Sequence, residues 1–341
     1  MAPPLLSLLV SVSDLTFGVY YDFRCLDAEP AALTRRWQGI VEQVRWAEQL
    51  GYGSAWVSEH HFVDDNYASS TLTLLAALAV ATDHMWLGTN VLVLPVQNPL
   101  RLAEDALTVD ALSGGRLRLG LGLGYRAADL EPFGASLRGR RRRFEDGFRV
   151  LRRACHGEPV DGVRVSPRPV RDGGPELWIG ALSPPGIERA ARLGDGFVCV
   201  LPNQIGDYVE ARRKLGLADG RIALGNQWIV AEDPERAWAA VGNAVLYQVN
   251  RYIDFGIFGP PGSVPRLTDP QQVLDINQYR LLDGPAAVDE LVRQVRSGPV
   301  VDCFSWTLFP GEPLTQAAER LEYFASHVMP AVRETLAAPH E

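Results

Sequence analysis

The sequence predicts an α/β fold, a (β/α)8 TIM barrel with an insertion between strands seven and eight. Short apolar strand candidates alternate with amphipathic helix candidates, which is the pattern of a parallel α/β protein. Eight strand candidates are present, and eight strands are enough to close a barrel. The length of 341 residues suits one such barrel or two modest domains. An open, doubly wound sheet is the alternative arrangement of these elements.

Each predicted strand is a short apolar run bounded by turn residues or by the start of a helical pattern. The eight runs lie near Leu15–Tyr21, Ser54–Ser58, Met85–Leu94, Arg116–Tyr125, Glu176–Ala181, Gly196–Leu201, Ile222–Val230 and Val300–Leu308. We expect residues 15–335 to form one barrel domain. An apolar tail over residues 1–14 precedes it and lacks the basic start and cleavage pattern of a signal peptide.

Helical periodicity fills the segments between these runs. In the first helix, apolar residues recur at three- and four-residue spacing, and Gly51 stands where a C-terminal cap belongs. Pro99 opens the helix after strand three, where its missing N–H is no loss, and Gly114 and Gly115 end that helix. The next helix is lined by Phe144, Phe148 and Leu151.

Two segments depart from the barrel pattern. The helix over residues 68–82 has no charged face, although an outer barrel helix should keep one side in water. This pattern predicts a homodimer through the 68–82 helix, with cover by a loop of the same chain as the alternative. The insertion at residues 259–283 is rich in proline and glycine and forms either a lid over the barrel mouth or a surface excursion.

Composition narrows the classes of partner. The net charge of −8 disfavours nucleic acid and anionic membranes as partners. No apolar run approaches the roughly 20 residues needed to cross a bilayer. The four cysteines contain no C-x-x-C pair, so we expect buried thiols and a cytoplasmic location.

The segment after strand two carries the first functional candidates, Glu59, His60 and His61. Active sites of barrels lie at the C-terminal ends of the strands, so one histidine is expected to project into the mouth as a base or hydrogen-bond donor. A metal site is disfavoured, because neighbouring residues of a strand point to opposite faces. The sequence also has no H-x-H or H-E-x-x-H motif. The alternative is that the histidine is a packed polar side chain with no catalytic role.

Strand four places leucines on one face and Gly120, Gly122 and Gly124 on the other. If the leucines face the helices, the glycines leave room for a flat ligand near the top of the barrel. The same stretch also matches a weak dinucleotide fingerprint, G-x-G-x-x-A, through Gly122, Gly124 and Ala127. That interpretation requires the open sheet.

A phosphate site is predicted after strand five. Ser183 and Gly186 open a helix, where a hydroxyl and free backbone N–H groups suit a phosphate. An ordinary capping serine is the alternative. The arginine run at 138–143 offers counter-charge, because a guanidinium grips phosphate with two parallel hydrogen bonds.

These residues resemble the luciferase-like monooxygenase family. Three stretches carry the resemblance, which covers roughly Leu15 to Pro330. They are Trp56-Val-Ser-Glu-His-His-Phe62, then Leu87-Gly-Thr-Asn-Val-Leu-Val-Leu-Pro95 with Asn98-Pro99 and Leu112-Ser-Gly-Gly-Arg116, and finally Gly120-Leu-Gly-Leu-Gly-Tyr125. The Glu-His-His form is most similar to the FMN-using luciferase α-type members.

The resemblance implies a barrel that binds reduced FMN (FMNH2) or a deazaflavin coenzyme. His60 matches the catalytic histidine, with Glu59 orienting it. The matched cofactor-binding positions are Asn90 and Val91 beneath the flavin ring, Gly122, Gly124 and Tyr125 beside it, and Ser183, Gly186 and Arg141 at the phosphate. One departure is Leu123, which stands where the luciferases carry a second phosphate arginine. Arg126 or another arginine of the 138–143 run is a possible substitute.

The implied reaction is a monooxygenation. Reduced flavin reacts with O2 to a flavin peroxide, which transfers one oxygen atom to a small organic substrate. A separate flavin reductase is expected, because one barrel uses up the chain. The alternatives are a deazaflavin-dependent oxidoreductase that moves hydride, a non-catalytic flavin-binding subunit, and a metal-dependent barrel hydrolase. Retention of His60 argues against the non-catalytic subunit.

Overall fold

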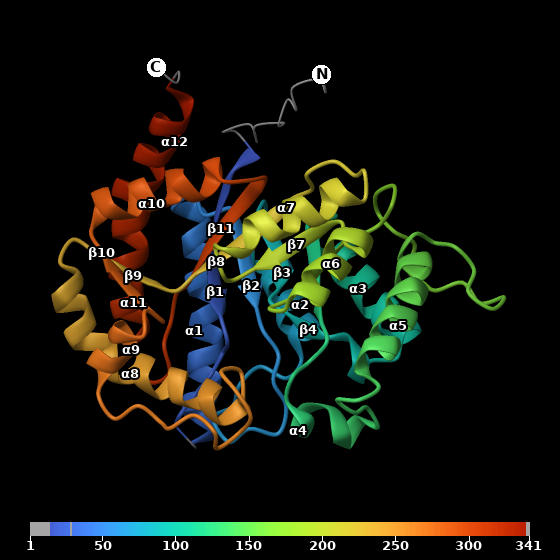
Figure 1. Ribbon diagram of the computed structural model, residues 1–341, viewed down its shortest axis with the longest axis horizontal. Coiled ribbons are helices and arrows are strands. Elements are labelled where there is room, and N and C mark those ends of the chain that lie inside the picture. The colour runs from blue at the N-terminus through green and yellow to red at the C-terminus, as the bar shows by residue number, and fades with distance from the viewer. Residues whose placement is uncertain (1–13, 28, 339–341) are drawn as a thin grey trace.

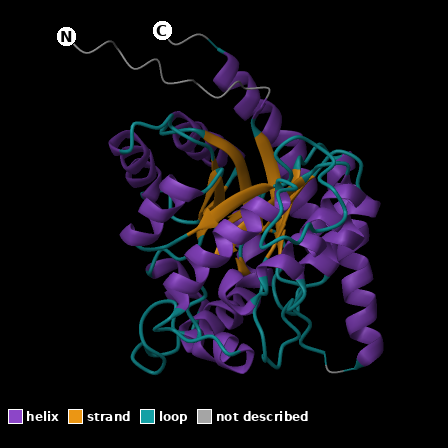
Figure 2. Ribbon diagram, turned by 90° about the vertical axis from the view of Figure 1, so that its right-hand side faces the viewer, coloured by secondary structure: helices purple, strands orange, loops and turns teal. Residues whose placement is uncertain are grey.

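Eight parallel strands form a closed barrel inside a ring of helices (Figures 1 and 2). The computed structural model describes residues 14–27 and 29–338, so nearly all of the predicted tail at 1–14 lies outside the described residues. The barrel strands are β1 (Thr16–Tyr21), β2 (Ser54–Val57), β3 (Trp86–Thr89), β5 (Leu117–Gly122), β6 (Glu176–Gly180), β7 (Gly196–Cys199), β8 (Ile222–Asn226) and β11 (Val300–Trp306).

Closure of the sheet excludes the open arrangement. The order is β3-β2-β1-β11-β8-β7-β6-β5, and β3 pairs with β5 through Leu87 opposite Leu117. Every pair in this ring is parallel. The predicted (β/α)8 barrel is therefore confirmed. The dinucleotide fingerprint, which required an open sheet, is wrong.

Two of the predicted strands are each divided. The third consists of β3 and the short β4 (Leu92–Val93), with a cis peptide bond between Asn90 and Val91 at the bend. The seventh predicted strand belongs to the barrel only as far as the end of β8. Its continuation β9 (Trp228–Val230) pairs instead with β10 (Arg280–Leu282), a strand that the predicted insertion contributes.

The helices form the outer layer, and several begin with proline preceded by a capping residue. Asn98, for example, accepts hydrogen bonds from the backbone N–H groups of Leu100 and Arg101 at the start of α3. The longer helices are α1 (Pro30–Gln49), α2 (Thr71–Ala81), α3 (Pro99–Ser113), α5 (Arg140–Cys155), α6 (Pro184–Leu193), α7 (Gln204–Lys214), α8 (Pro234–Phe255), α10 (Gly284–Arg296), α11 (Leu314–Tyr323) and α12 (Met329–Ala337). The shorter ones are η2 (Leu94–Val96), α4 (Ala127–Leu130), η3 (Glu131–Phe133), α9 (Pro270–Asp275) and the π-helical turn η4 (Phe324–Val328).

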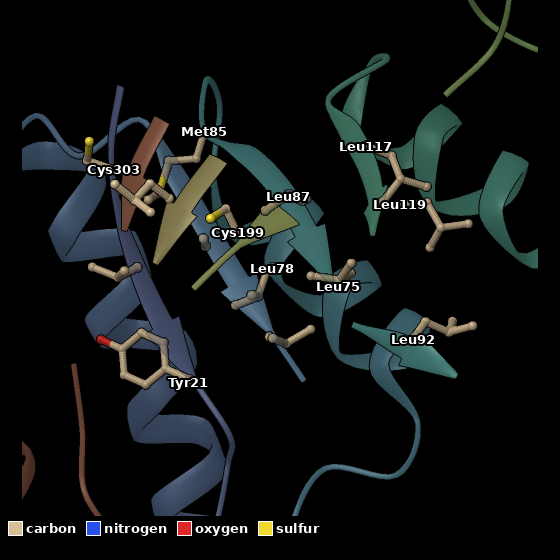
Figure 3. Packing of buried hydrophobic residues seen from close by; sticks show 14 of the residues in the cluster. Tyr21, Leu75, Leu78, Met85, Leu87, Leu92, Leu117, Leu119, Cys199 and Cys303 are labelled. Carbon is tan, nitrogen blue, oxygen red and sulfur yellow. The ribbon is translucent and has the colours of Figure 1, made fainter. Parts of the chain in front are cut away.

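The main core lies between the outer face of the barrel and the helices. Leu117 and Leu119 of β5 belong to it, as do Leu75 and Leu78 of α2 (Figure 3). Leu121 of β5 is a further member. Burial of such side chains contributes roughly 1.5–3 kcal/mol each. A second core is rich in aromatic rings from the alternate strand faces, namely Tyr20, Trp56, Trp178, Phe304 and Trp306. The predicted division of β5 into a leucine face and a glycine face is confirmed.

The insertion at residues 259–283 is held against α8. The side chain of Asn250 donates to the Leu267 carbonyl at 2.9 Å and accepts from the Leu267 N–H at 2.8 Å. Arg266 forms an ion pair with Asp254. Figure 1 shows the loop before α9 along the lower edge of the molecule, beside α8, and β10 higher up beside β9. Its role as a lid stays a prediction.

Among the described residues, no helix has the length and apolar character needed to cross a membrane.

Candidate active site

The candidate site lies at the C-terminal ends of the strands, where the loops after β2 and β5 meet along the lower edge of Figure 1. His60 follows β2 by three residues, and its backbone N–H donates to the Ala68 carbonyl at 3.0 Å. Ala68 in turn donates to the carbonyl of Asp22, after β1, at 3.0 Å. These bonds connect the first two strand ends and fix the backbone that carries the histidine.

His60 is held between an acid and a phenol. Its Nδ1 lies 2.7 Å from Oδ2 of Asp129, and its Nε2 lies 3.1 Å from the Tyr125 hydroxyl. Only 6% of the residue is exposed. Asp129 also accepts hydrogen bonds from the His61 backbone N–H at 3.1 Å and from Arg126 at 2.6 Å.

The ionisation of Asp129 decides which nitrogen of His60 carries the proton. Burial alone would raise the pKa of this carboxyl, but hydrogen bonds from His60, His61 and Arg126 outweigh burial and lower the pKa below 3.8. Because Asp129 is ionised at neutral pH, Nδ1 of His60 donates to it. Nε2 is then the nitrogen that faces the Tyr125 hydroxyl as a hydrogen-bond acceptor.

The prediction that Glu59 orients His60 is wrong. Glu59 Oε1 lies 2.9 Å from Nε2 of His61 and accepts from the Val93 N–H at 3.4 Å. The two histidine rings therefore have different carboxylate partners, Asp129 for His60 and Glu59 for His61. Alternation along the chain separates the rings, as the sequence indicates. Within the described residues, no group of three or more histidine, cysteine or acidic side chains is arranged to hold a metal.

Aromatic rings enclose His60. Its ring centroid lies 4.9 Å from Tyr67 and 4.8 Å from Phe255, with Tyr125 and Tyr252 at 5.6 and 6.4 Å. Burial raises the pKa of Tyr67 and of Tyr125 well above 10, so both phenols stay protonated as hydrogen-bond donors. The enclosure excludes water from the imidazole.

A buried cation stands behind these rings. The Arg24 guanidinium lies 4.4 Å from the centroid of Tyr67 and 5.2 Å from that of Tyr252. Ion pairs with Asp22 at 3.0 Å and Asp65 at 2.9 Å neutralise it. Because both acids are also buried, this group is part of the support for the site rather than a free anion receptor.

The glycine face of β5 makes room for a segment of the chain itself, and not for a flat ligand as predicted. A Cβ at Gly120 would lie 1.9 Å from the Thr89 carbonyl oxygen, one at Gly122 2.3 Å from Val91 Cγ2, and one at Gly124 2.8 Å from Val93 Cγ1. Segment 89–93 therefore occupies the space that we predicted to be empty. The glycines seat this segment in the barrel mouth, and it leaves Asn90 and Val91 half-buried.

The predicted phosphate turn is only partly suited to an anion. Pro184 and Pro185 open α6 and carry no N–H, and the N–H groups of Gly186 and Ile187 both donate to the Ser183 carbonyl at 2.8 and 2.9 Å. The expectation of free backbone N–H donors on these four residues is wrong. The Ser183 hydroxyl is exposed and makes no capping hydrogen bond, so it remains a donor for a ligand.

Arginines of α5 are the candidates for the counter-charge to a phosphate. Exposed Arg141 on α5 lies 3.5 Å from Glu145, which also pairs with Arg189 of α6 at 3.1 Å, so the two helix starts are connected. Arg126 is committed to Asp129 and to the His61 carbonyl, so it does not replace the arginine missing at Leu123. Half-buried Arg140 forms no hydrogen bond or ion pair with the described residues and remains available.

The arrangement fits a flavin. The half-buried segment at Asn90 and Val91 and the enclosed imidazole of His60 suit a planar ring, and the arginines of α5 suit a phosphate tail. Sequence reasoning missed three residues that contact His60, namely Tyr67 of the same loop, Asp129 of α4 and Phe255 at the end of α8. The local signal at Asp129 was only an acid three residues after an arginine.

The profile of the family described as "Luciferase-like monooxygenase" matches residues 16–279. The chain is 29% identical to 4-hydroxyprotoasukamycin monooxygenase from Streptomyces nodosus subsp. asukaensis, over 75% of each chain. It is 23% identical to the oxygenase component of flavin-dependent trigonelline monooxygenase from Acinetobacter baylyi, over 87% of this chain and 90% of that protein.

Solved structures share the fold. Monooxygenase RslO1 from Streptomyces bottropensis superposes with a TM-score of 0.77 at 23% identity, covering 93% of this chain and 99% of that one. The oxygenating constituent of 3,6-diketocamphane monooxygenase from Pseudomonas putida, in complex with FMN, gives 0.70 at 16% identity and covers 93% and 98%. An F420-dependent secondary alcohol dehydrogenase gives 0.68 at 20% identity and covers 93% and 99%.

Proposed function

Because this chain belongs to the luciferase-like monooxygenase family, we propose that it uses reduced FMN and O2 to insert one oxygen atom into a small organic substrate. One observation carries the proposal. His60, fixed between Asp129 and Tyr125, lies at the barrel mouth, where segment 89–93 is seated against β5. A proton-transferring group and a flat platform thus belong to one site.

Each residue has a role in this proposal. Reduced FMN, when bound, supplies the electrons that activate O2. Asn90 and Val91 support the ring. Arg141, Arg140, Ser183 and the Gly186 turn hold the phosphate, with the guanidinium groups giving most of the attraction because the turn has few free N–H groups.

His60 holds and moves a proton at Nε2, while Asp129 keeps Nδ1 protonated and the ring oriented. Tyr125 donates to Nε2 in the resting state and turns toward a ligand when one is present. Phe255 and Tyr67 keep bulk water from the imidazole, which protects a reactive step from hydrolysis.

A separate reductase is part of the proposal. The trigonelline enzyme similar to this chain is named as an oxygenase component, which implies a second component that supplies reduced flavin. A cytoplasmic location also belongs to the proposal. It is supported by the four cysteines, which are unpaired and buried, as expected in a reducing compartment.

The experiment begins with an anaerobic titration of the purified protein with reduced FMN. Next, a flavin reductase and ¹⁸O2 are added to a panel of small ketones, aldehydes and aromatic compounds. We expect binding and the gain of one labelled oxygen atom in at least one compound. His60→Ala should keep flavin binding and lower product formation by about 100-fold. Exposed His84→Ala is the matched control. Absence of reduced FMN binding, or full activity of His60→Ala, would contradict the proposal.

A deazaflavin-dependent hydride transfer is the second candidate. It is favoured by the similar fold of the F420-dependent alcohol dehydrogenase. Competition between reduced FMN and reduced F420 in the same titration separates the two. Tighter binding of F420, together with product formation that needs no O2, would support the second candidate.

We also propose a homodimer through α2. Between residues 68 and 82 there is no charged side chain, and 70% of Val80 is exposed on the outer side of α2. Leu112 of the adjacent α3 is also exposed. Light scattering should give the mass of two chains for the native protein and of one chain for Val80→Arg. Val163→Arg, at an exposed valine elsewhere, should stay dimeric. A monomeric native protein would contradict this part.

A further inference from the structure

We propose that the start of α5 and an adjacent pair of phenylalanines form a surface that captures reduced FMN from solution before it enters the barrel mouth. This capture surface consists of Arg138, Arg142, Arg143, Phe62 and Phe133. The inference rests on the proposed function and adds a step to it, the arrival of an anionic flavin at a negatively charged protein.

Charge is strongly concentrated in α5. The helix carries seven arginines and two acidic residues, a net charge of +5, in a chain whose net charge is −8. The phosphate of FMN is an anion that the rest of the chain repels. A local positive field at one end of the barrel therefore decides where such a ligand first meets the protein.

The position of these arginines is unfavourable for the helix itself. Four of them occupy the first turn of α5, which contains no acidic residue, and the N-terminus of a helix is its positive end. A cation there is destabilising, because it faces the positive end of the helix dipole. A role outside the helix explains why the sequence keeps them.

Their side chains are available to a ligand. The side chain of Arg142 is 92% exposed and has a single partner, Asp146, at 3.5 Å. Arg138 forms no hydrogen bond or ion pair with any described residue. Arg142 and Arg143 also line a groove of about 670 Å³ between the starts of α3 and α5, together with Gln97 and Asn98. This volume falls in the range of small-molecule sites.

An exposed aromatic pair lies next to this cationic group. Phe62 is 61% exposed and Phe133 is 42% exposed, and their ring centroids lie 5.5 Å apart. The His61 ring lies 4.9 Å from Phe133, so the pair borders the histidine motif. Arg143 donates to the carbonyl of Gly134, the residue after Phe133, at 2.9 Å, which joins the aromatic and cationic parts.

The backbone at Phe62 supports a functional role for the pair. Its φ is +53°, a left-handed conformation that is unfavourable for a bulky side chain. Residues held in such conformations concentrate at functional sites. Because 61% of Phe62 is exposed, the ring contributes little to the core, whereas a planar ligand stacked on it would add contact area.

Reduced FMN matches both halves of the surface. Its isoalloxazine ring is flat and largely apolar and suits the phenyl pair, and its phosphate suits the guanidinium groups. We commit to the free flavin as the occupant. An acidic face of the reductase is the competing occupant, which the experiment separates.

The test is anaerobic stopped-flow mixing of reduced FMN with Arg138→Gln/Arg142→Gln. We expect the association rate to fall by about 10-fold at low ionic strength, and the difference to disappear near roughly 0.5 M salt. Turnover at saturating reduced FMN should equal that of the native protein. The melting temperature should not fall, because the change relieves repulsion at the helix start.

Arg149→Gln/Arg153→Gln is the matched control. It removes the same charge from the same helix beyond its first two turns. The aromatic half is tested by Phe62→Asn, since asparagine tolerates the left-handed backbone. This change should slow association several-fold without altering its salt dependence. Leu215→Asn, at an exposed leucine after α7, should leave the rate unchanged.

The outcomes are distinct. If the native protein does not bind reduced FMN, the proposed function itself fails. If it binds and the double arginine variant associates at the native rate, the capture surface is wrong and the proposed function stands. If the variants slow turnover only when a reductase delivers the flavin, the surface docks that protein and the flavin assignment is overturned.

Discussion

Asp129 lies 2.7 Å from the imidazole of His60, although 69 residues separate them in the chain. The contact joins the loop after β2 to α4 after β5, and β3 lies between these strands in the barrel. The protonation of the histidine therefore depends on a carboxylate from a different part of the fold.

Replacement of this carboxylate tests its positioning role. Asp129→Asn should lower the rate of oxygenation by about 100-fold with little effect on flavin affinity, because the amide no longer favours the tautomer with a proton on Nδ1. The pH profile of the rate should shift as well, which a purely structural role would not produce. Asp105→Asn on α3, at a half-buried acid that pairs with Arg101, is the control. A native pH profile for Asp129→Asn would refute the role.

Replacement of an arginine that binds the FMN phosphate should weaken the binding of reduced FMN but not the binding of reduced riboflavin. Arg141→Gln is expected to weaken reduced FMN binding by about 10-fold, near 1.4 kcal/mol, because a charge-assisted contact to phosphate is removed. Reduced riboflavin, which has no phosphate, should bind equally to the native protein and the variant. Arg149→Gln on the same helix should bind FMN normally. Equal losses for both flavins would show that Arg141 acts elsewhere.

Gly120 packs so closely against segment 89–93 that a side chain at this position should not fit. A Cβ there would lie 1.9 Å from the Thr89 carbonyl oxygen, so Gly120→Ala should reduce the free energy of unfolding by about 3 kcal/mol or more. Gly206→Ala is a matched substitution with open space around the new methyl group, and in exposed α7 it should stabilise by about 0.5–1 kcal/mol. Urea denaturation measures both. Similar stability for the two variants would contradict the close approach.

Asp302, which is buried inside the barrel, should make the free energy of unfolding depend on pH. Burial, partly offset by Arg118, raises its pKa from 3.8 to about 6. The folded protein therefore binds this proton more tightly than the unfolded chain. The stabilising contribution is complete below about pH 3.8 and is lost as the pH rises through about 6.

Comparison with Asp302→Asn isolates this contribution. Between pH 4 and pH 7 the native protein should lose about 2 kcal/mol of unfolding free energy relative to the variant, because one pKa unit equals about 1.4 kcal/mol and part of the contribution is already lost at pH 4. Urea denaturation at several pH values measures the difference. Asp105→Asn, at a half-buried position on the outer layer of helices, should show the same pH dependence as the native protein. A constant difference between Asp302→Asn and the native protein would refute the raised pKa.

The barrel was predictable because its signals are local. Leu117, Leu119 and Leu121 alternate with small or polar residues, and the alternation alone indicates which face of β5 meets the helices. The position of His60 at a strand end followed in the same way. The partner of His60 could not be read from the chain, because the approach of Asp129 depends on how the barrel closes.

Two errors had different origins. Pro184 and Pro185 lack N–H groups, and this was visible in the sequence, so the overestimate of backbone donors at the α6 start was avoidable. The sequence could not show that Asp129, and not Glu59, contacts His60, because this depends on the directions of side chains in a loop. The choice of an arginine to replace the one missing at Leu123 also required the structure. Arg126 is bonded to Asp129, whereas Arg140 has no partner among the described residues.

The close fit of the β5 glycines against residues 89–93 limits where this enzyme can acquire new specificity. Side chains added at Gly120 or Gly122 would displace the platform rather than reshape a pocket. Libraries aimed at new substrates are therefore better directed at Tyr125 and Tyr252, half-buried residues that flank His60 from the loop after β5 and from α8. Diversity is expected to accumulate in those loops and helix ends, while the seat beneath them stays constant.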